Sequence, residues 1–317
     1  MKSTLTPQNS PVATLPLDTE PHIWSDLNPS INDDPRQNLL NYYSESLNDY
    51  DDWSQGKHMH FGYSHTAQQA FNLESMLEEM SRQVMQRLSL NANQNQQVID
   101  LGCGLGASCR FGAKNYQRTH FHGVSIVPSQ ISYAQTLNQK EPQENTIDYK
   151  CADYTHLPYS ENSFHAAYAI ESSCYASGLD KRDFLSEAYR VLKPGSHLVV
   201  ADGFLKNLVT MGPLLHYFHK RTCQSWAVET LADIDLFTRK MQQIGFKNIN
   251  VEDISWKVAP SFAFIPFVVI KFLLKEIVIK KRTFNRLNWG HVFAPFYASV
   301  LGLSRNHFGY YLITAEK

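Results

Sequence analysis

The order of apolar and polar positions along the chain predicts a mixed α/β fold. Short apolar runs bounded by Gly, Pro and polar residues are typical of buried strands. They occupy residues 97–101, 120–124, 147–151, 164–170, 197–202, 249–255 and 309–315. Apolar residues at helical spacing predict helices over residues 107–116, 131–137, 181–191 and 230–244. This alternation favours helices layered on a mostly parallel central sheet.

Segments on both sides of this core have a different composition. Residues 1–35 are rich in Pro, Ser, Thr, Asn and Asp and have no apolar period, so we expect a disordered tail. Residues 36–90 combine many aromatic side chains with an amphipathic helix at 72–88 and are expected to form an N-terminal helical lid. The core should span 91–255, and 256–317 should form a helical cap followed by the last core strand.

Charge and cysteine content limit the class of protein. A net charge of -1 with 19% charged residues gives no field that would attract nucleic acid, so we expect no such partner. The first residues hold one Lys and no apolar segment, which predicts no signal peptide. The five cysteines include no C-x-x-C pair, so reduced thiols and a cytoplasmic location are expected. The oligomeric state, including a homo-oligomer, stays open.

The run from Val98 to Gly106 (Val-Ile-Asp-Leu-Gly-Cys-Gly-Leu-Gly) reads as a buried strand that enters a glycine-rich turn. Gly102, Gly104 and Gly106 let the backbone turn tightly and approach a ligand closely, and the next helix would point its N-terminus at that ligand. The dinucleotide fingerprint G-x-G-x-x-G, with an acid roughly 20 residues further on, is not matched, because the second strand ends at Ser125.

The string Asp-Leu-Gly-Cys-Gly-Leu-Gly at 100–106 resembles motif I of class I S-adenosylmethionine (SAM)-dependent methyltransferases. The run Pro128-Ser-Gln130 and the turn Tyr189–Gly195 resemble a subgroup with tocopherol methyltransferases and cyclopropane fatty-acid synthases. The chain departs from most of the family by placing Ser125 where an acid is usual. The resemblance implies a Rossmann-like sheet of seven strands with an antiparallel last strand, and SAM as cofactor. It also implies cofactor contacts from Tyr43, Asp100, Gly102, Cys103, Gly104, Ser125, Ile126, Gln130, Asp153 and Tyr154.

Ahead of the core, Tyr42-Tyr43, Trp53 and the run His-Met-His-Phe-Gly-Tyr at 58–63 resemble the corresponding segment of sterol 24-C-methyltransferases. In those enzymes the segment closes over the cofactor and contributes to the acceptor pocket. The resemblance and the apolar cap together lead us to expect acceptor contacts from Trp53, His58, His60, Phe61, Cys174, His216, Phe218, Lys271 and Lys275. The histidines of this segment lack a carboxylate or thiol that would complete a metal site, so no metal ligand is assigned.

The fourth strand ends at Glu171, at the sheet edge where α/β enzymes bind their substrates. We expect Glu171 to be catalytic, with Tyr175, Tyr43 and Tyr63 as further candidates. A structural or cofactor-binding carboxylate is the alternative for Glu171. Cys174 should line the pocket and not act as a nucleophile, because no positioned base accompanies it.

The segment 259–282 is strongly apolar, but Pro266, Lys271 and Lys275 interrupt it too early for a membrane span. Three interpretations of its basic residues stay open. They could form the solvated face of a core helix, an interfacial helix on anionic lipid, or a basic rim for a phosphorylated acceptor.

The chemistry follows from the cofactor. The methyl of SAM is already activated, so the protein has mainly to align the acceptor and exclude water. An aromatic content of 12% and Glu171 favour methylation of an alkene carbon, because aromatic faces stabilise a cation. We therefore expect an isoprenoid acceptor, either a prenyl diphosphate such as farnesyl diphosphate, with Mg²⁺, or a sterol-like lipid. The alternatives are O-, N- or ring C-methylation of a tocopherol-like, quinol-like or other small natural product, and a non-catalytic lipid-binding or membrane-binding protein on the same fold. A dehydrogenase is disfavoured by the glycine spacing.

Overall fold

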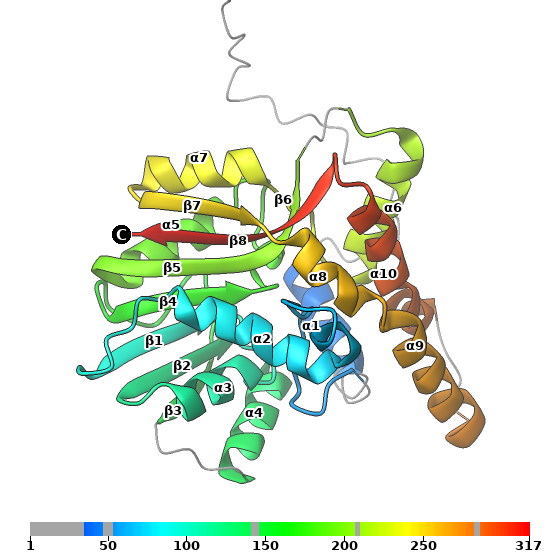
Figure 1. The fold of residues 1–317 in the computed structure, drawn as a ribbon, viewed down its shortest axis with the longest axis horizontal. Helices are drawn as coiled ribbons and strands as arrows, with labels where there is room; N and C mark the ends of the chain where they lie inside the picture. Colours follow the sequence, from blue (N-terminus) through cyan, green and yellow to red (C-terminus); the bar gives the residue numbers. More distant parts are fainter. Residues whose placement is uncertain (1–34, 47–52, 141–145, 207–209, 282–285) are drawn as a thin grey trace, which may run out of the picture.

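The computed structural model describes residues 35–46, 53–140, 146–206, 210–281 and 286–317, and their core is one twisted sheet (Figure 1). Its strands are β1 (Gln96–Leu101), β2 (Thr119–Ser125), β3 (Ile147–Cys151), β4 (Phe164–Ile170), β5 (Leu192–Leu205), β6 (Ala232–Asp233), β7 (Lys247–Asp253) and β8 (Phe308–Glu316). They are ordered β3-β2-β1-β4-β5-β8-β7, and the short β6 pairs with β5. Only β8 runs antiparallel to its neighbours β5 and β7 among these pairings. The predicted α/β fold and its antiparallel last strand are confirmed.

Helices cover both faces of the sheet (Figure 1). They are α1 (Pro35–Ser46), α2 (Leu73–Gln86), α3 (Ala107–Asn115), α4 (Pro128–Lys140), α5 (Arg182–Val191), α6 (Pro213–Ser225), α7 (Ile234–Ile244), α8 (Ser255–Phe262), α9 (Ile265–Leu273) and α10 (Arg286–Leu303), with short 3-10 or π turns η3 (Gln69–Phe71), η4 (Ser173–Tyr175) and η6 (Leu274–Ile279). The helix predicted from residue 230 begins later, because β6 comes first and Asp233 caps α7 by accepting from the N–H groups of Asp235 and Leu236. The predicted tail at 1–35 lies outside the described residues, except for Pro35.

Two apolar layers hold the helices to the sheet. Successive residues of β1 point to opposite faces, so Ile99 packs in the layer beneath α5 and α7, and Val98 packs in the layer beneath α2 and α3. Phe184 and Ala188 of α5 are fully buried in the first layer at the spacing of one helical turn. The sheet is therefore packed on both sides, and the ends of its strands place functional side chains at defined positions.

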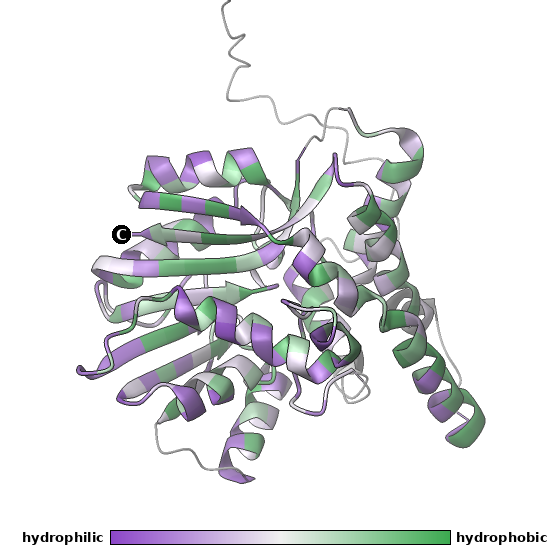
Figure 2. Cartoon of the chain, in the orientation of Figure 1, coloured by the Kyte–Doolittle hydropathy of each residue, from purple (hydrophilic) through white to green (hydrophobic). Residues whose placement is uncertain are grey.

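Beyond the carboxyl ends of the parallel strands lie α1, α6, α8, α9 and α10 (Figure 1). Helix α1 comes from the segment predicted as a lid and α9 and α10 from the segment predicted as a cap, whereas α6 comes from the segment predicted as core. Helix α10 packs against α6 and leads into β8. Helix α9 projects furthest from the sheet, and its ribbon is coloured as apolar over much of its length (Figure 2). Within the described ranges, no helix combines the length and apolar character needed to cross a membrane.

Candidate active site

The described residues enclose two adjoining cavities at the carboxyl edge of the sheet. The smaller has a volume of about 240 Å³ and lies at the ends of β1 and β2. The larger has a volume of about 620 Å³ and lies beneath α8, α9 and α10. Both are lined by Tyr43, Met59, His60, Glu171 and Tyr175. Two molecules that occupied the two cavities would therefore meet at this shared wall.

The glycine-rich turn forms the floor of the smaller cavity. Gly102 and Gly104 have φ angles of +117° and +51°, which side-chain-bearing residues rarely adopt. A Cβ on Gly102 would lie 2.3 Å from Cβ of Ser172, and one on Gly104 would lie 2.8 Å from Sδ of Met59. Both positions thus require glycine, and a bound molecule can approach the backbone closely.

Polar side chains complete the smaller cavity. Burial raises the pKa of Asp100 to about 7, although Tyr168 and Cys109 hydrogen-bond to its carboxyl. Ser125 donates its hydroxyl to Oε1 of Gln130 at 2.7 Å, and Asp153 accepts the hydroxyl of Thr155 at 2.7 Å.

All ten residues predicted to contact the cofactor line this cavity, namely Tyr43, Asp100, Gly102, Cys103, Gly104, Ser125, Ile126, Gln130, Asp153 and Tyr154. An open backbone turn beside carboxyl, hydroxyl and amide groups fits a nucleoside cofactor with polar ends. The individual contacts of these residues with a cofactor stay a prediction.

Glu171 is the carboxyl at the junction of the two cavities. Its Oε1 accepts the Phe61 N–H and the Tyr310 hydroxyl, each at 2.7 Å. Burial raises its pKa to about 8, although both hydrogen bonds favour the ionised form. The described residues donate no hydrogen bond to Oε2. That oxygen can therefore take a proton near neutral pH.

A neutral imidazole pair stands beside Glu171. Nδ1 of His60 lies 2.9 Å from the Phe61 carbonyl, which can only accept, so Nδ1 carries the proton. Nε2 of His60 then accepts from Nδ1 of His58 at 3.2 Å. Burial lowers the pKa of His60 to about 4, so this wall is uncharged at pH 7.

The larger cavity is rich in aromatic rings. Phe61 stacks on Phe262 with centroids 4.1 Å apart, and Trp53 meets Phe61 edge-on at 5.8 Å. The hydroxyls of Tyr43 and Tyr175 lie 2.8 Å apart on the wall that the two cavities share. These side chains present the faces and edges that bind an apolar molecule and stabilise positive charge.

A buried polar group that the sequence reasoning missed supports the floor of the larger cavity. Asp202, near the end of β5, accepts the Ser173 hydroxyl at 2.6 Å and the Cys174 N–H at 3.0 Å, and burial raises its pKa. Lys181 is fully buried and donates to the carbonyls of Cys174, Ala176 and Thr230 at 2.6–3.0 Å. Together they fix the loop that follows Glu171.

Of the residues predicted to bind the acceptor or act in catalysis, Trp53, His60, Phe61, Cys174, Tyr43, Tyr175 and Glu171 line the larger cavity. The structure does not bring Tyr63, His58, His216, Phe218, Lys271 or Lys275 to its wall.

Each of these six residues has a different environment. Tyr63 packs in the core beneath α2, and His58 is buried behind His60. Phe218 of α6 packs against Leu301 and Phe308. His216 lies on the same helix without reaching the cavity. Lys271 of α9 is exposed and Lys275 of η6 is partly buried, and neither lines the cavity.

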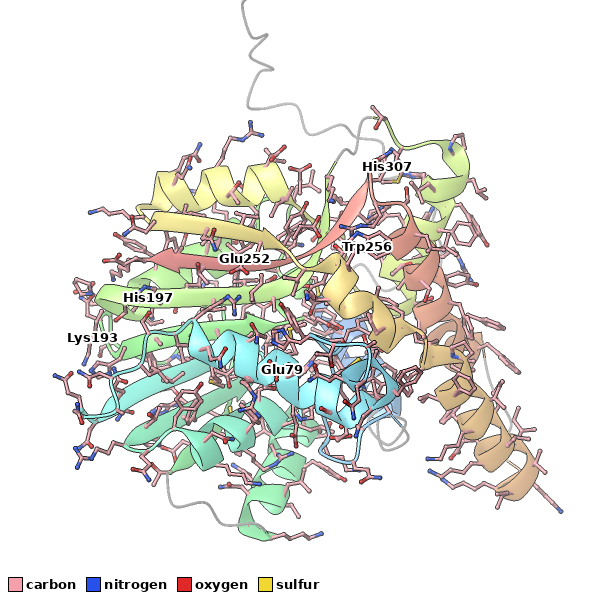
Figure 3. All side chains as sticks on the ribbon, viewed as in Figure 1. Glu79, Lys193, His197, Glu252, Trp256 and His307 are labelled. Carbon is pink, nitrogen blue, oxygen red and sulfur yellow. The ribbon has the colours of Figure 1, made fainter. Side chains whose placement is uncertain are left out.

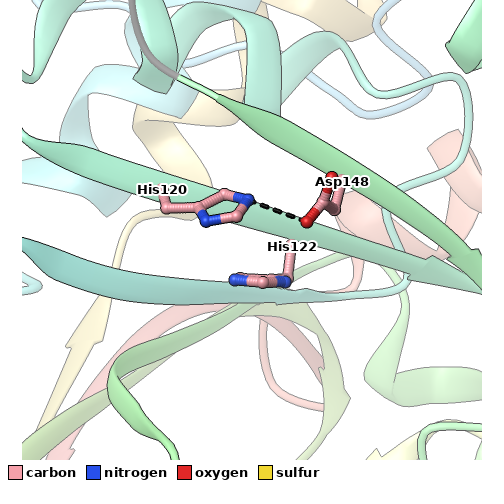
Figure 4. A group of neighbouring side chains, drawn as sticks. All are labelled: His120, His122 and Asp148. Atoms are coloured by element: carbon pink, nitrogen blue, oxygen red, sulfur yellow. Dashed lines mark ion pairs between the residues drawn. The ribbon is translucent and has the colours of Figure 1, made fainter.

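One side-chain group in the described part of the chain could hold a metal ion, namely His120, His122 and Asp148 (Figure 4). Nε2 of His120 lies 2.9 Å from Oδ2 of Asp148. The group sits near the amino ends of β2 and β3, and none of its members lines either cavity. Imidazole ligands suit transition metals better than Mg²⁺.

Among the described lining residues of the larger cavity, the carboxyls are Glu171 and Asp202. Both oxygens of Asp202 and Oε1 of Glu171 accept hydrogen bonds from the protein. In the described part of the cavity wall, Oε2 of Glu171 is therefore the one carboxylate oxygen that accepts none, and Mg²⁺ stays a prediction.

Comparisons with known proteins agree with this geometry. Residues 99–200 match the family described as a methyltransferase domain. The O-methyltransferase resE of Aspergillus sclerotiorum is 31% identical over 218 residues, which cover 69% of this chain and 76% of the relative. The 24-methylenesterol C-methyltransferase 2 of Arabidopsis thaliana is 31% identical over 153 residues, 48% of this chain and 40% of the relative. Geranyl diphosphate C-methyltransferase from Streptomyces coelicolor superposes with a TM-score of 0.66 at 15% identity, over 91% of this chain and 99% of that one.

Proposed function

We propose that this chain, which belongs to the SAM-dependent methyltransferases, methylates an alkene carbon of an uncharged isoprenoid or sterol-like lipid. The cofactor would occupy the smaller cavity and the acceptor the larger one. The acceptor class rests on one observation above all, which is the composition of the larger cavity.

That cavity combines aromatic walls with very little positive charge. Its volume of about 620 Å³ lies within the range of roughly 300–1,000 Å³ that is usual for small-molecule sites. Among its described lining residues, Arg305 is the one Lys or Arg. Its guanidinium binds both carboxylate oxygens of Asp253 at 2.7 and 2.8 Å. Among the described lining residues a diphosphate would find no uncommitted cation, so a neutral lipid suits the cavity better than farnesyl diphosphate.

The residues at the shared wall have distinct roles in this mechanism. When bound, SAM would supply an activated methyl group for attack by the alkene π electrons, and its sulfur would keep the electrons of the broken C–S bond. The rings of Tyr43 and Tyr175 lie where they can stabilise the cation left on the acceptor. Oε2 of Glu171 takes the proton from the carbon next to that cation, and an alkene with one more carbon results. The hydrogen bonds from Phe61 and Tyr310 hold Glu171 in place.

A second candidate is O-methylation of an apolar hydroxyl compound. It is favoured by relatives such as resE, an O-methyltransferase by its printed name. Glu171 would then accept the hydroxyl proton as the oxygen attacks the methyl group. The two candidates use the same residue but give products with the methyl group on different atoms.

The test uses purified protein with SAM whose methyl group is labelled with carbon-13. The acceptors are an unsaturated sterol, farnesol, farnesyl diphosphate and a quinol, each assayed separately. We expect a sterol or farnesol product one methylene heavier, with the label on carbon by NMR. A label on oxygen would favour the second candidate. Turnover of farnesyl diphosphate alone would overturn the argument from cavity charge.

A further inference from the structure

Helix α9 and its continuation η6 are apolar on two faces. One face points inward, where Ile265, Phe272 and Glu276 are buried and Val268 and Val269 line the larger cavity. These positions recur every three or four residues, as expected for one helical face. The inner face is thus explained by the cavity that it covers.

The opposite face is apolar and exposed. Phe267, Ile270, Leu274 and Val278 follow one another at helical spacing, and 73%, 57%, 56% and 64% of their surfaces are exposed. Figure 2 shows apolar colour along the outward side of this projecting element. Nearby on the cap, Trp256 of α8 (Figure 3) and Leu303 of α10 are exposed as well. A row of exposed apolar side chains along one face of a helix is typical of an interaction site.

Basic residues accompany the exposed stripe. Lys271 follows Ile270, Lys275 follows Leu274, and Lys280 and Lys281 stand at the outer end. The segment 255–281 contains five lysines and one acid, Glu276, while the whole chain carries a net charge of -1. Lys280 pairs with Glu276 at 2.7 Å. Positive charge is therefore concentrated beside the apolar stripe.

We propose that α9 and η6 dock on an anionic lipid surface, with Phe267, Ile270, Leu274 and Val278 entering the interface and the lysines contacting lipid phosphates. An apolar stripe flanked by lysines is the arrangement by which interfacial helices bind membranes. A second copy of the chain fits less well, because a symmetric pairing of this face would bring like charges together. Docking here would place the cap of the larger cavity at the surface that holds the lipid acceptor, a consequence that rests on the proposed function.

The test measures sedimentation of the full chain with vesicles that contain no acceptor, either neutral phosphatidylcholine or phosphatidylcholine with phosphatidylglycerol. We expect at least tenfold stronger binding to the anionic vesicles, and loss of that preference at high salt. Lys271→Gln with Lys275→Gln should weaken anionic binding by roughly tenfold or more. Phe267→Ser with Ile270→Ser should weaken binding to a similar degree at all salt concentrations.

The matched control is Leu236→Ser, an exposed apolar position on α7, which lies away from the cap (Figure 1). It should bind vesicles as the wild type does, and all variants should bind SAM with unchanged affinity by calorimetry. Equal sedimentation of the Phe267/Ile270 variant and the wild type would overturn the proposal. So would a concentration-dependent dimer that this variant abolishes, in a protein that ignores vesicles. Vesicle binding without methylation of any lipid would instead leave the docking surface standing and reject the proposed acceptor.

Discussion

Replacing Glu171 by Gln should make the protein more stable at high pH and nearly inactive. The carboxyl has a pKa of about 8 in the folded chain against an ordinary value of 4.5. Because folding raises this pKa, the stabilising contribution of the group is present below 4.5 and is lost as the pH rises through 8. Glutamine keeps an oxygen that can accept from the Phe61 N–H and the Tyr310 hydroxyl, but it has no charge to desolvate.

The size of the effect follows from the two pKa values. If the carboxylate were fully excluded from water, it would lower the free energy of unfolding by about 4 kcal/mol more at pH 9 than at pH 5. The side chain borders both cavities, so water reduces this cost, and we expect about 2 kcal/mol, or a rise of about 3 °C in melting temperature for the variant at pH 9. At pH 5 the two proteins should melt within about 1 °C of each other, since the group is neutral when folded.

The assay is thermal unfolding of both proteins from pH 5 to pH 9, followed by methyl transfer at each pH. Wild-type transfer should rise with pH toward a plateau above 8, and the variant should lose roughly a hundredfold or more. Glu187→Gln is the matched control, for which we expect a change in stability of the opposite sign. Burial opposes ionisation of Glu187, but hydrogen bonds from Arg190 and the Leu157 N–H hold its pKa below the ordinary value. That variant should therefore be less stable at neutral pH. Identical pH dependence of melting in the wild type and Glu171→Gln would refute the reasoning.

Three further changes test the surroundings of Glu171. Tyr310→Phe removes one of two hydrogen bonds that favour the carboxylate, so the midpoint of the pH–rate profile should move up by up to about one unit; an unchanged midpoint would contradict this. Lys181→Met leaves three buried carbonyls without their donor and should lower the free energy of unfolding, measured in urea, by about 3 kcal/mol. The control Lys240→Met breaks a partly exposed pair with Asp180 and should lower it by less than about 1 kcal/mol. Gly102→Ala places a Cβ 2.3 Å from Ser172 at a φ of +117° and should weaken SAM binding at least tenfold by calorimetry; wild-type affinity would show that the turn can adapt.

The sequence predicted the parts of the site that depend on local pattern. Strand β1 and its glycine turn are contiguous in the chain, so their apolar run and glycine spacing were sufficient to predict a buried strand followed by a tight turn. Glu171 was predicted because it ends an apolar run at the carboxyl edge of the sheet. The same signal was present at Asp202, which follows the apolar run of β5 in the same way, and it was not used.

Tyr310 and Lys181 depend on tertiary structure that no local pattern encodes. Tyr310 meets Glu171 because β8 inserts beside β5 with Gly203 opposite Tyr310. Lys181 has no apolar or polar period that would predict its complete burial. The orientation of helix α9 could not be predicted, for a physical reason. Its sequence is apolar on two faces, and periodicity alone does not decide which face lies inward. Lys271 and Lys275, which were predicted to contact the acceptor, do not line the larger cavity.

The wall shared by the two cavities has a consequence for the order in which ligands bind. Tyr43, Met59 and His60 come from the segment ahead of the sheet and contact both spaces. Whichever molecule binds first would therefore contact a surface that the second one also uses, so we expect each molecule to raise the affinity of the other. Linkage requires that each ligand raise the affinity of the other by the same factor. When the demethylated cofactor leaves, the affinity for the methylated product should then fall. The same wall would thus favour binding of both substrates and later release of the product.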